Sequence, residues 1–316
     1  MSREEVYTRE KCDQITTFTS TEKGPREVSV AEKYYDLVTD FYEVGWGNCF
    51  HYAPQGKNET YREAIIKYEM ALAKALGLKA GMQVLDVGCG VGGPMMNIAK
   101  ATGCEITGIT ICDYQISKGK KYVEEAGLSH LCHFLHGDFM GTTLPSESFD
   151  AIFALETTCH ATDKTVCFTE MYRLLKPGQL FGGYEWCVTP QYDKNNPEHR
   201  HIIEMIEHGT QTQKTATFEE VNQALINAGF TVLESRNVCT EGLSWAGPLY
   251  KSLRRRKPVR ILIDFALKVA EKFKKVPPGT TQVAAYLELG ADAFIKAEKL
   301  GIFTPNYFFL ARKPME

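Results

Sequence analysis

The chain has 316 residues, of which 44% are hydrophobic and 24% are charged, and its formal net charge is −3. This length predicts one large domain or a core domain with a substantial appendage. The small net charge argues against a protein that binds nucleic acid through its overall field. The ten cysteines are scattered, with no C-x-x-C pair, which argues against a disulfide scaffold and predicts a reducing, cytoplasmic compartment.

The amino-terminal segment is expected to be a flexible tail followed by a helical lid. Residues 1–28 are rich in Ser, Thr, Glu and Lys and lack periodicity and the apolar run of a signal peptide or spanning helix. Residues 29–32 and 60–63 match helix capping boxes, so we expect two helices within residues 29–80. Aromatic residues at helical spacing usually pack in a hydrophobic core. Trp46, close to Tyr42, stands instead in a glycine-rich turn, so we expect this segment to form a lid that covers a bound ligand.

The segment 84–94 predicts a strand, a glycine-rich turn and the start of a helix. Gly88, Gly90 and Gly92 stand at alternate positions, where a missing Cβ permits positive φ and close approach of a ligand to the backbone. The rival interpretation, a dinucleotide-binding turn, requires G-x-G-x-x-G spacing and an acidic residue about 20 residues later. Here the acid, Asp86, precedes the glycines, an order that suits the ammonium group of S-adenosylmethionine. The turn therefore predicts a site for that cofactor.

Strand and helix patterns alternate over residues 81–240. Strands are expected at 83–87, 105–110, 133–135, 149–155, 179–186 and 231–237, and helices begin near Met95, Tyr114, Lys164 and Thr217. Residues 176–178 are interpreted as a turn. The alternation predicts an α/β fold with a doubly wound, mostly parallel sheet.

Ligands in such a sheet lie beyond the carboxyl ends of the strands, which selects further candidate residues. Thr110 and Ile111 end the second strand and Gln115 follows one turn later, where they could face the ribose of an adenosine. Asp138 and Phe139 follow the third strand and could face the adenine ring. The structural alternatives are that Gln115 is a solvated helix residue and that Asp138 belongs to a simple turn.

The fourth and fifth strands end in residues with acid–base or charge-stabilising potential. Glu156 and His160 share one loop, a combination that suits proton transfer or stabilisation of a positive charge. Glu185 and Trp186 repeat the pattern at the next strand end. The alternative for His160 is a hydrogen-bonded structural histidine. The eight His and ten Cys show no ligand spacing such as H-E-x-x-H, so we expect no metal site.

Residues 241–316 are expected to form an appended, mainly helical subdomain. Within them, residues 251–275 contain ten Lys or Arg and two acids, so this window carries a net charge of +8 and the rest of the chain −11. Leu262, Phe265, Val269 and Phe273 recur along one helical face. This pattern is typical of peripheral contact with an anionic membrane, and equally of a solvated helix packed on the core.

Six ordered motifs resemble those of the sterol 24-C-methyltransferase family. They comprise residues 42–47 with 50–51, the glycine turn through Pro94, and residues 137–140, 156–161, 184–189 and 302–305 with 308–314. The resemblance extends from about Val30 to Pro314 and includes a carboxyl-terminal motif outside the shared methyltransferase core.

The resemblance implies transfer of the methyl group of S-adenosylmethionine to a side-chain alkene carbon of a sterol, on a Rossmann-like fold. The carbocation would then undergo a hydride shift and lose a proton. Glu156, Glu185 and the leading aromatic residues would stabilise the cation, and His51, His160 or a carboxylate would take the proton. Residues 81–240 would bind the cofactor and residues 241–316 the sterol. The expected place of work is the cytosolic face of the endoplasmic reticulum or lipid droplets.

Three departures from the family pattern leave the acceptor open. Val44 stands where an aromatic residue is usual, Thr157 replaces an alanine, and residues 208–212 replace a stretch rich in Gly, Asp and Pro. Methylation of another sterol carbon or of a linear isoprenoid is therefore an alternative. A non-catalytic sterol- or cofactor-binding protein is a further one, against which the intact glycine turn argues. The preferred sterol, the number of methyl groups added and the oligomeric state are not readable from the sequence.

Overall fold

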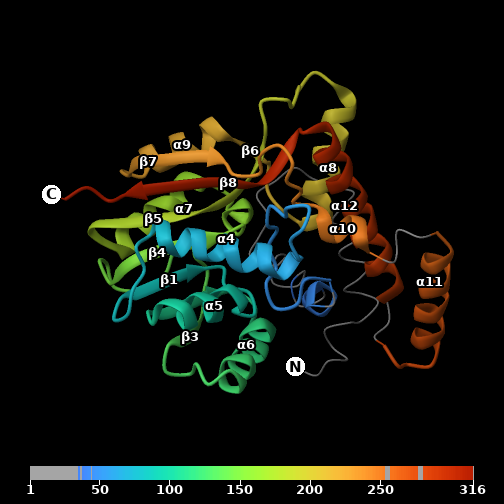
Figure 1. The fold of residues 1–316 in the computed structure, drawn as a ribbon, viewed down its shortest axis with the longest axis horizontal. Coiled ribbons are helices and arrows are strands. Elements are labelled where there is room, and N and C mark those ends of the chain that lie inside the picture. The colour runs from blue at the N-terminus through green and yellow to red at the C-terminus, as the bar shows by residue number, and fades with distance from the viewer. Residues whose placement is uncertain (1–34, 36–37, 44, 253–256, 277–279, 316) are drawn as a thin grey trace.

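The computed structural model describes residues 35, 38–43, 45–252, 257–276 and 280–315. The expected tail at 1–28, the first capping box and Val44 lie outside these residues. Figure 1 shows a central sheet covered by helices on both faces. The strand order is β3-β2-β1-β4-β5-β8-β7, and the short β6 pairs with β5.

The strands are β1 (Gln83–Val87), β2 (Glu105–Thr110), β3 (Cys132–His136), β4 (Phe149–Leu155), β5 (Leu175–Val188), β6 (Ala216–Thr217), β7 (Thr231–Asn237) and β8 (Phe303–Arg312). Neighbouring pairs from β3 to β5 are parallel, whereas β8 runs antiparallel to both β5 and β7. The prediction of a doubly wound, mostly parallel sheet is confirmed.

Two helical layers cover the sheet. The first consists of α4 (Tyr61–Ala75), α5 (Gly93–Thr102) and α6 (Asp113–Glu125), and the second of α7 (Lys164–Leu174) and α9 (Phe218–Asn227). Neighbouring residues of β1 face different layers, since Val84 packs in the first core cluster and Leu85 in the second. The capping box predicted at Thr60 is confirmed at the start of α4, and the helix expected to begin near Thr217 is α9, which also starts with a capping box.

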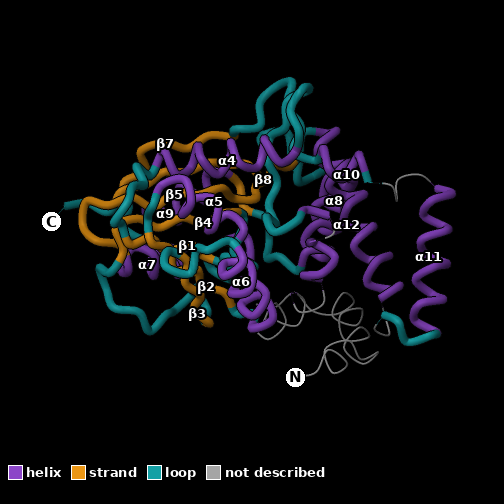
Figure 2. Tube along the Cα trace, turned by 60° about the horizontal axis from the view of Figure 1, so that its bottom comes forward, coloured by secondary structure: helices purple, strands orange, loops and turns teal. Residues whose placement is uncertain are grey.

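The remaining helices gather beyond one end of the sheet. They are α8 (Pro197–Thr210), α10 (Gly247–Lys251), α11 (Lys257–Lys272) and α12 (Thr280–Leu300). In Figures 1 and 2, α11 stands at the edge of the molecule with α12 between it and the rest of the fold. Among the described residues, no helix is both long and apolar enough to cross a membrane.

Three features differ from the sequence predictions. Residues 176–178 belong to β5, where the register with β4 shifts, so the expected turn is a strand irregularity. The last strand, β8, lies between β5 and β7, so the segment 241–316, expected to be an appended and mainly helical subdomain, ends in a strand of the core sheet. Within the expected lid, α4 packs on the core through the buried Tyr68 and Leu72, because its apolar face covers the sheet.

Candidate functional site

A cavity of about 1130 Å³ runs from the carboxyl ends of β1, β2 and β4 to α10, α11 and α12. Most predicted site residues line it at the sheet end: Tyr42, Trp46, Gly88, Gly90, Thr110, Ile111, Gln115, Asp138, Phe139, Glu156 and His160. The other four, which are His51, Asp86, Gly92 and Glu185, are not among the described residues that line it.

The glycine turn places bare backbone against the cavity. Gly88 and Gly90 both have positive φ, +71° and +57°, which favours glycine. A Cβ on Gly90 would have only ordinary contact in this structure, 3.6 Å from Phe50, and would project where a ligand could approach. Gly92 differs, because a Cβ there would meet the Phe134 ring at 2.7 Å. Gly92 therefore serves the close packing at the start of α5.

Asp86 sits behind the turn with unused hydrogen-bonding capacity. It is 2% exposed, and its Oδ2 has no hydrogen-bond partner within the described part of the chain. Burial raises the pKa of this carboxyl well above its usual range, and the nearby Glu69 carboxylate raises it further. An unpaired buried acid is costly, so this position suits a cationic partner. Together with the bare turn, it fits the amino-acid part of S-adenosylmethionine.

At the next strand end, Gln115 belongs to a buried polar chain. Its Oε1 accepts a hydrogen bond from Thr110 at 3.0 Å, and its Nε2 donates to Thr39 at 3.3 Å. Gln115 is 3% exposed, so the alternative of a solvated helix residue is wrong. These hydrogen bonds link the segment that precedes β1 to the end of β2.

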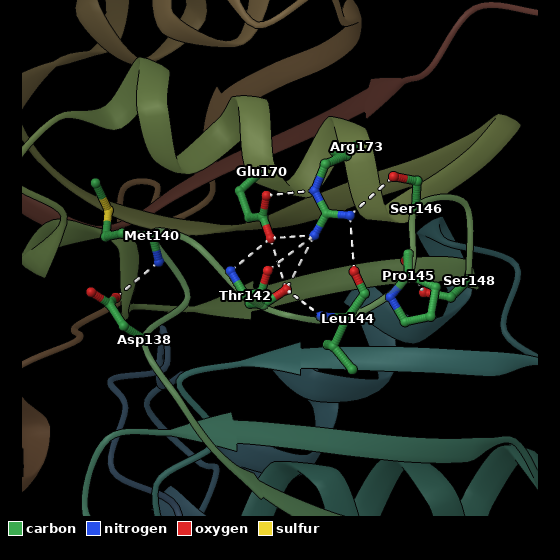
Figure 3. Close-up of polar contacts among 9 residues, drawn as sticks. All are labelled: Asp138, Met140, Thr142, Leu144, Pro145, Ser146, Ser148, Glu170 and Arg173. Carbon is green, nitrogen blue, oxygen red and sulfur yellow. Dashed lines mark hydrogen bonds and ion pairs between the residues drawn. The ribbon is translucent and has the colours of Figure 1, made fainter.

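The loop that carries Asp138 is braced by α7, as Figure 3 shows. Arg173 donates to the carbonyl of Leu144 at 2.9 Å, and Glu170 accepts from the backbone N–H of Thr142 at 2.9 Å. Asp138 itself accepts from the N–H of Met140 at 2.8 Å and lines the cavity. The bracing therefore holds the later part of the loop, while the Asp138 carboxylate is left facing the cavity.

Glu156 lines the cavity and is held in a strained backbone conformation. Its φ is +56°, a left-handed value that costs a non-glycine residue about 1–2 kcal/mol. Oε1 accepts from the N–H of Tyr52 and Oε2 from the indole N–H of Trp186, each at 2.9 Å. Burial raises the pKa of this carboxyl well above its usual range, while the two hydrogen bonds lower it. The strain and the fixed donors point to a functional carboxylate.

His160 follows in a short 3-10 helix, Thr158–His160. Its Nε2 lies 2.6 Å from the hydroxyl of Tyr35, which also lines the cavity. Beneath the turn, Glu185 is fully buried and pairs with Lys164 at 2.9 Å, and Thr158 donates its hydroxyl proton to the same carboxylate. Glu185 therefore supports this turn instead of facing the cavity.

His51 is also turned away from the cavity. Its Nε2 lies 3.0 Å from Glu69, its ring stacks on Tyr68, and it is 2% exposed. Glu69 further accepts from the amide of Asn97 at 2.8 Å. Ligand atoms of Cys49, His51 and Glu69 lie within 4.8 Å of one another, a grouping that no ligand spacing in the sequence indicates. The hydrogen bonds account for this cluster as a structural link between α4, α5 and the preceding loop.

Comparisons with known proteins agree with this geometry. A methyltransferase domain model matches residues 85–182, and a sterol methyltransferase C-terminal model matches residues 250–315. The chain is 40% identical over 315 residues to the cycloartenol-C-24-methyltransferase of Arabidopsis thaliana, covering 96% of this chain and 94% of that protein. It is 39% identical over 296 residues to the sterol 24-C-methyltransferase ERG6 of Saccharomyces cerevisiae, covering 89% and 77%. The chain belongs to the sterol methyltransferase family.

Solved structures support the fold of this sterol methyltransferase family member. The cyclopropane synthase MmaA2 from Mycobacterium tuberculosis superposes with a TM-score of 0.69 at 18% identity, over 92% of this chain and 100% of that one.

Two of the three departures from the family pattern lie at the cavity, since Thr157, Thr210 and Gln211 line it. Thr157 also covers the glycine turn, where a Cβ on Gly88 would meet its hydroxyl oxygen at 1.8 Å.

Proposed function

We propose that this protein transfers the methyl group of S-adenosylmethionine to the side-chain alkene carbon C24 of a sterol. The observation that carries the proposal is the cavity that joins the glycine turn, Glu156 and the helices α10 to α12. A sterol is long, rigid and apolar. Its ring system suits the helical end, which Leu249, Leu287 and Phe294 help to line, while its side chain would reach Glu156.

The reaction makes limited chemical demands on the protein. When bound, S-adenosylmethionine would supply an electrophilic methyl group to the alkene π electrons, and its sulfur–methyl bond would break to leave S-adenosylhomocysteine. The substrate becomes a carbocation, a hydride shift moves the charge, and loss of a proton restores a double bond. The alkene is its own nucleophile, so the protein must orient it, exclude water and stabilise positive charge.

Aromatic rings and one carboxylate at the sheet end meet this demand. Tyr42 and Trp46 pack edge to face with ring centroids 5.7 Å apart, and both line the cavity. Aromatic faces attract cations within about 6 Å without acting as nucleophiles. We assign stabilisation of the cation to Glu156 together with Trp46 and Trp186. His160, which lines the cavity beside Tyr35, is our candidate for the proton acceptor.

The decisive experiment incubates the purified protein with methyl-labelled S-adenosylmethionine and sterols that differ in the side-chain double bond. We expect label in the side chain, located by mass spectrometry, when that alkene is present. Label on the ring system or on alkene-free sterols would overturn the proposal.

A second candidate is C-methylation of another sterol position or of a linear isoprenoid. The observation that favours it is that Thr157 and Thr210, two of the departures from the family pattern, line the cavity. A linear isoprenoid in the same assay separates these acceptors. Cofactor binding without label on any acceptor would indicate a binding protein.

We further propose that the protein works at a membrane surface, on the cytosolic face of the endoplasmic reticulum or on lipid droplets, through the 251–275 segment. Leu262, Phe265 and Phe273 are 66%, 64% and 68% exposed along α11 and the turn after it. Ile263 and Leu267, on the same helix, line the cavity. Lys268 and Lys272 lie beside this exposed face. Each basic residue near an anionic membrane surface contributes roughly 1 kcal/mol to the free energy of membrane binding.

Flotation with liposomes tests this contact. We expect binding to anionic vesicles and weaker binding to neutral phosphatidylcholine vesicles. The double variant Leu262→Ser/Phe265→Ser should lose most of this binding, and Leu262→Ser alone should lose part of it, whereas Ile226→Ser, a comparable single change at a 53% exposed site on α9, should not. Equal flotation of both variants, or none of the wild type, would refute the contact.

A further inference from the structure

The helical end of the cavity is apolar except at a few positions. Along α12, the residues that line it recur at helical spacing: Thr280, Ala284, Leu287, Glu288, Ala291 and Phe294. Glu288 is the charged member of this row, and its side chain is 13% exposed. A carboxylate placed among Ala and Leu side chains against a cavity needs an explanation beyond solvation.

Helix α12 leads from the reaction centre to Glu288 along the wall of the cavity. Phe294 packs on Trp186 with ring centroids 5.4 Å apart, and Trp186 donates to Glu156. Glu288 precedes Phe294 on α12 by six residues, which is about 9 Å of helix rise at 1.5 Å per residue. A molecule whose side chain reaches Glu156 would therefore extend its ring system along α12 toward Glu288.

We propose that Glu288 accepts a hydrogen bond from the hydroxyl group at the ring end of the sterol, and so sets the depth to which the side chain enters the reaction centre. The inference rests on the proposed function. Arg260 of α11 donates to Glu288 Oε1 at 3.2 Å. A carboxylate has about four acceptor positions, so it can hold Arg260 and a hydroxyl group together.

Other charged groups of the cavity are less suited to this task. Asp138 and Glu156 lie at the sheet end, and Asp40 accepts from Tyr114 and Lys118. Lys251 is exposed and lies 3.4 Å from Gln55. The plain alternative is that Glu288 and Arg260 are an ion pair that fastens α11 to α12, and such a pair would not discriminate between sterols.

The test compares a sterol bearing the ring hydroxyl with its 3-deoxy and 3-methoxy analogues, which cannot donate a hydrogen bond. Equilibrium binding is measured by quenching of tryptophan fluorescence, because Trp46 and Trp186 line the cavity. This readout needs no turnover, so it stands whether or not methyl transfer is found. We expect wild-type protein to prefer the hydroxyl form by roughly 10- to 100-fold, the usual effect of a hydrogen bond to a charged group.

Glu288→Leu should remove that preference, and Glu288→Gln, which keeps an acceptor oxygen, should retain part of it. Asp292→Leu is the matched control, one turn later on α12 and not among the described residues lining the cavity. Arg260→Met tests the ion pair alone. An unchanged preference in Glu288→Leu, or an equal loss of affinity for all three sterols in Glu288→Leu and Arg260→Met, would overturn the inference. A preserved preference with label transferred elsewhere would overturn the proposed function instead.

Discussion

The two ends of the cavity are formed by different kinds of residues. At and just behind the sheet end, Asp86, Glu156 and Glu185 are 2%, 7% and 0% exposed, and they lie in or directly after strands of the sheet. At the helical end, apolar side chains of α10 to α12 form the lining around Glu288. We infer that charge placement at the sheet end governs the chemistry, whereas the apolar lining and Glu288 at the helical end govern which molecule is held. Changing buried charges at the sheet end should therefore produce large effects.

The largest effect is expected from Lys164→Met. This change removes the cation that faces the buried Glu185 carboxylate, and breaking a buried ion pair typically costs about 3–5 kcal/mol in the free energy of unfolding. Urea unfolding of the free protein measures it. The double variant Lys164→Met/Glu185→Leu should recover much of the loss, because no charge is left unpaired. A loss below about 1 kcal/mol, typical of surface pairs, would show that the pair is solvated.

The same double variant separates two roles for Glu185. If Glu185 supports the turn that carries His160, a stable double variant should keep binding the cofactor while its kcat falls because the turn shifts. If Glu185 had no link to the site, kcat would be unchanged once stability was restored.

The parts of the fold predicted from sequence are those fixed by local patterns. The strands at 105–110, 149–155 and 231–237 coincide with β2, β4 and β7, since each shows a short apolar pattern between turn signals. The strand β8 was missed, although Tyr307, Phe308 and Phe309 form a visible apolar run. Its position between β5 and β7 is set by pairing with residues far away in the chain, which periodicity does not reveal.

The same limit applies to the site. The glycine turn and Glu156 were found because cofactor turns and strand ends have local signatures. The partners of Glu156 were not found, since the N–H of Tyr52 lies 104 positions away in the sequence. His51 and Glu185 were expected to face the substrate, and the residues that draw them into the interior, Glu69 and Lys164, carry no motif. Residue type suggested chemistry, but burial decided orientation.

The next largest effect is expected from Glu156→Gln. The amide lacks the negative charge and turns a donor toward Tyr52 or Trp186, so kcat should fall about 10²- to 10³-fold, as when a preorganised electrostatic group is removed. Cofactor affinity should change little. Retention of more than about a tenth of the wild-type kcat would remove Glu156 from the role of cation stabiliser.

Glu156 also predicts the sign of the pH dependence. Burial holds its pKa well above the usual range, so the carboxylate is lost on acidification earlier than for an ordinary glutamate. We expect kcat to fall as the pH drops through this raised pKa and to be level above it. A pH–rate profile measures this fall in kcat at low pH, and the residual activity of Glu156→Gln should not show it.

The smallest effect is expected from the titration of Asp86, which should change the affinity for the cofactor by at most tenfold per pH unit. In the free protein, burial and the Glu69 carboxylate raise the pKa of Asp86, so it keeps its proton to a higher pH than an ordinary aspartate does, and the ammonium group of a bound cofactor would displace that proton. Binding of S-adenosylhomocysteine, which carries the same ammonium and is not turned over, should release up to one proton within that pH window. Calorimetry in two buffers of different ionisation enthalpy counts it. Affinity should rise with pH and level off above the free-protein pKa.

Without the cofactor, the folded protein binds this proton more tightly than the unfolded chain does, so its stability should fall as pH rises through the same window. Asp86→Asn should abolish both the proton release and this slope, and Glu69→Gln should shift the window to lower pH because one of the two causes is gone. Equal proton release in wild type and Asp86→Asn would assign the proton to another group and leave the buried acid without a part in binding the cofactor.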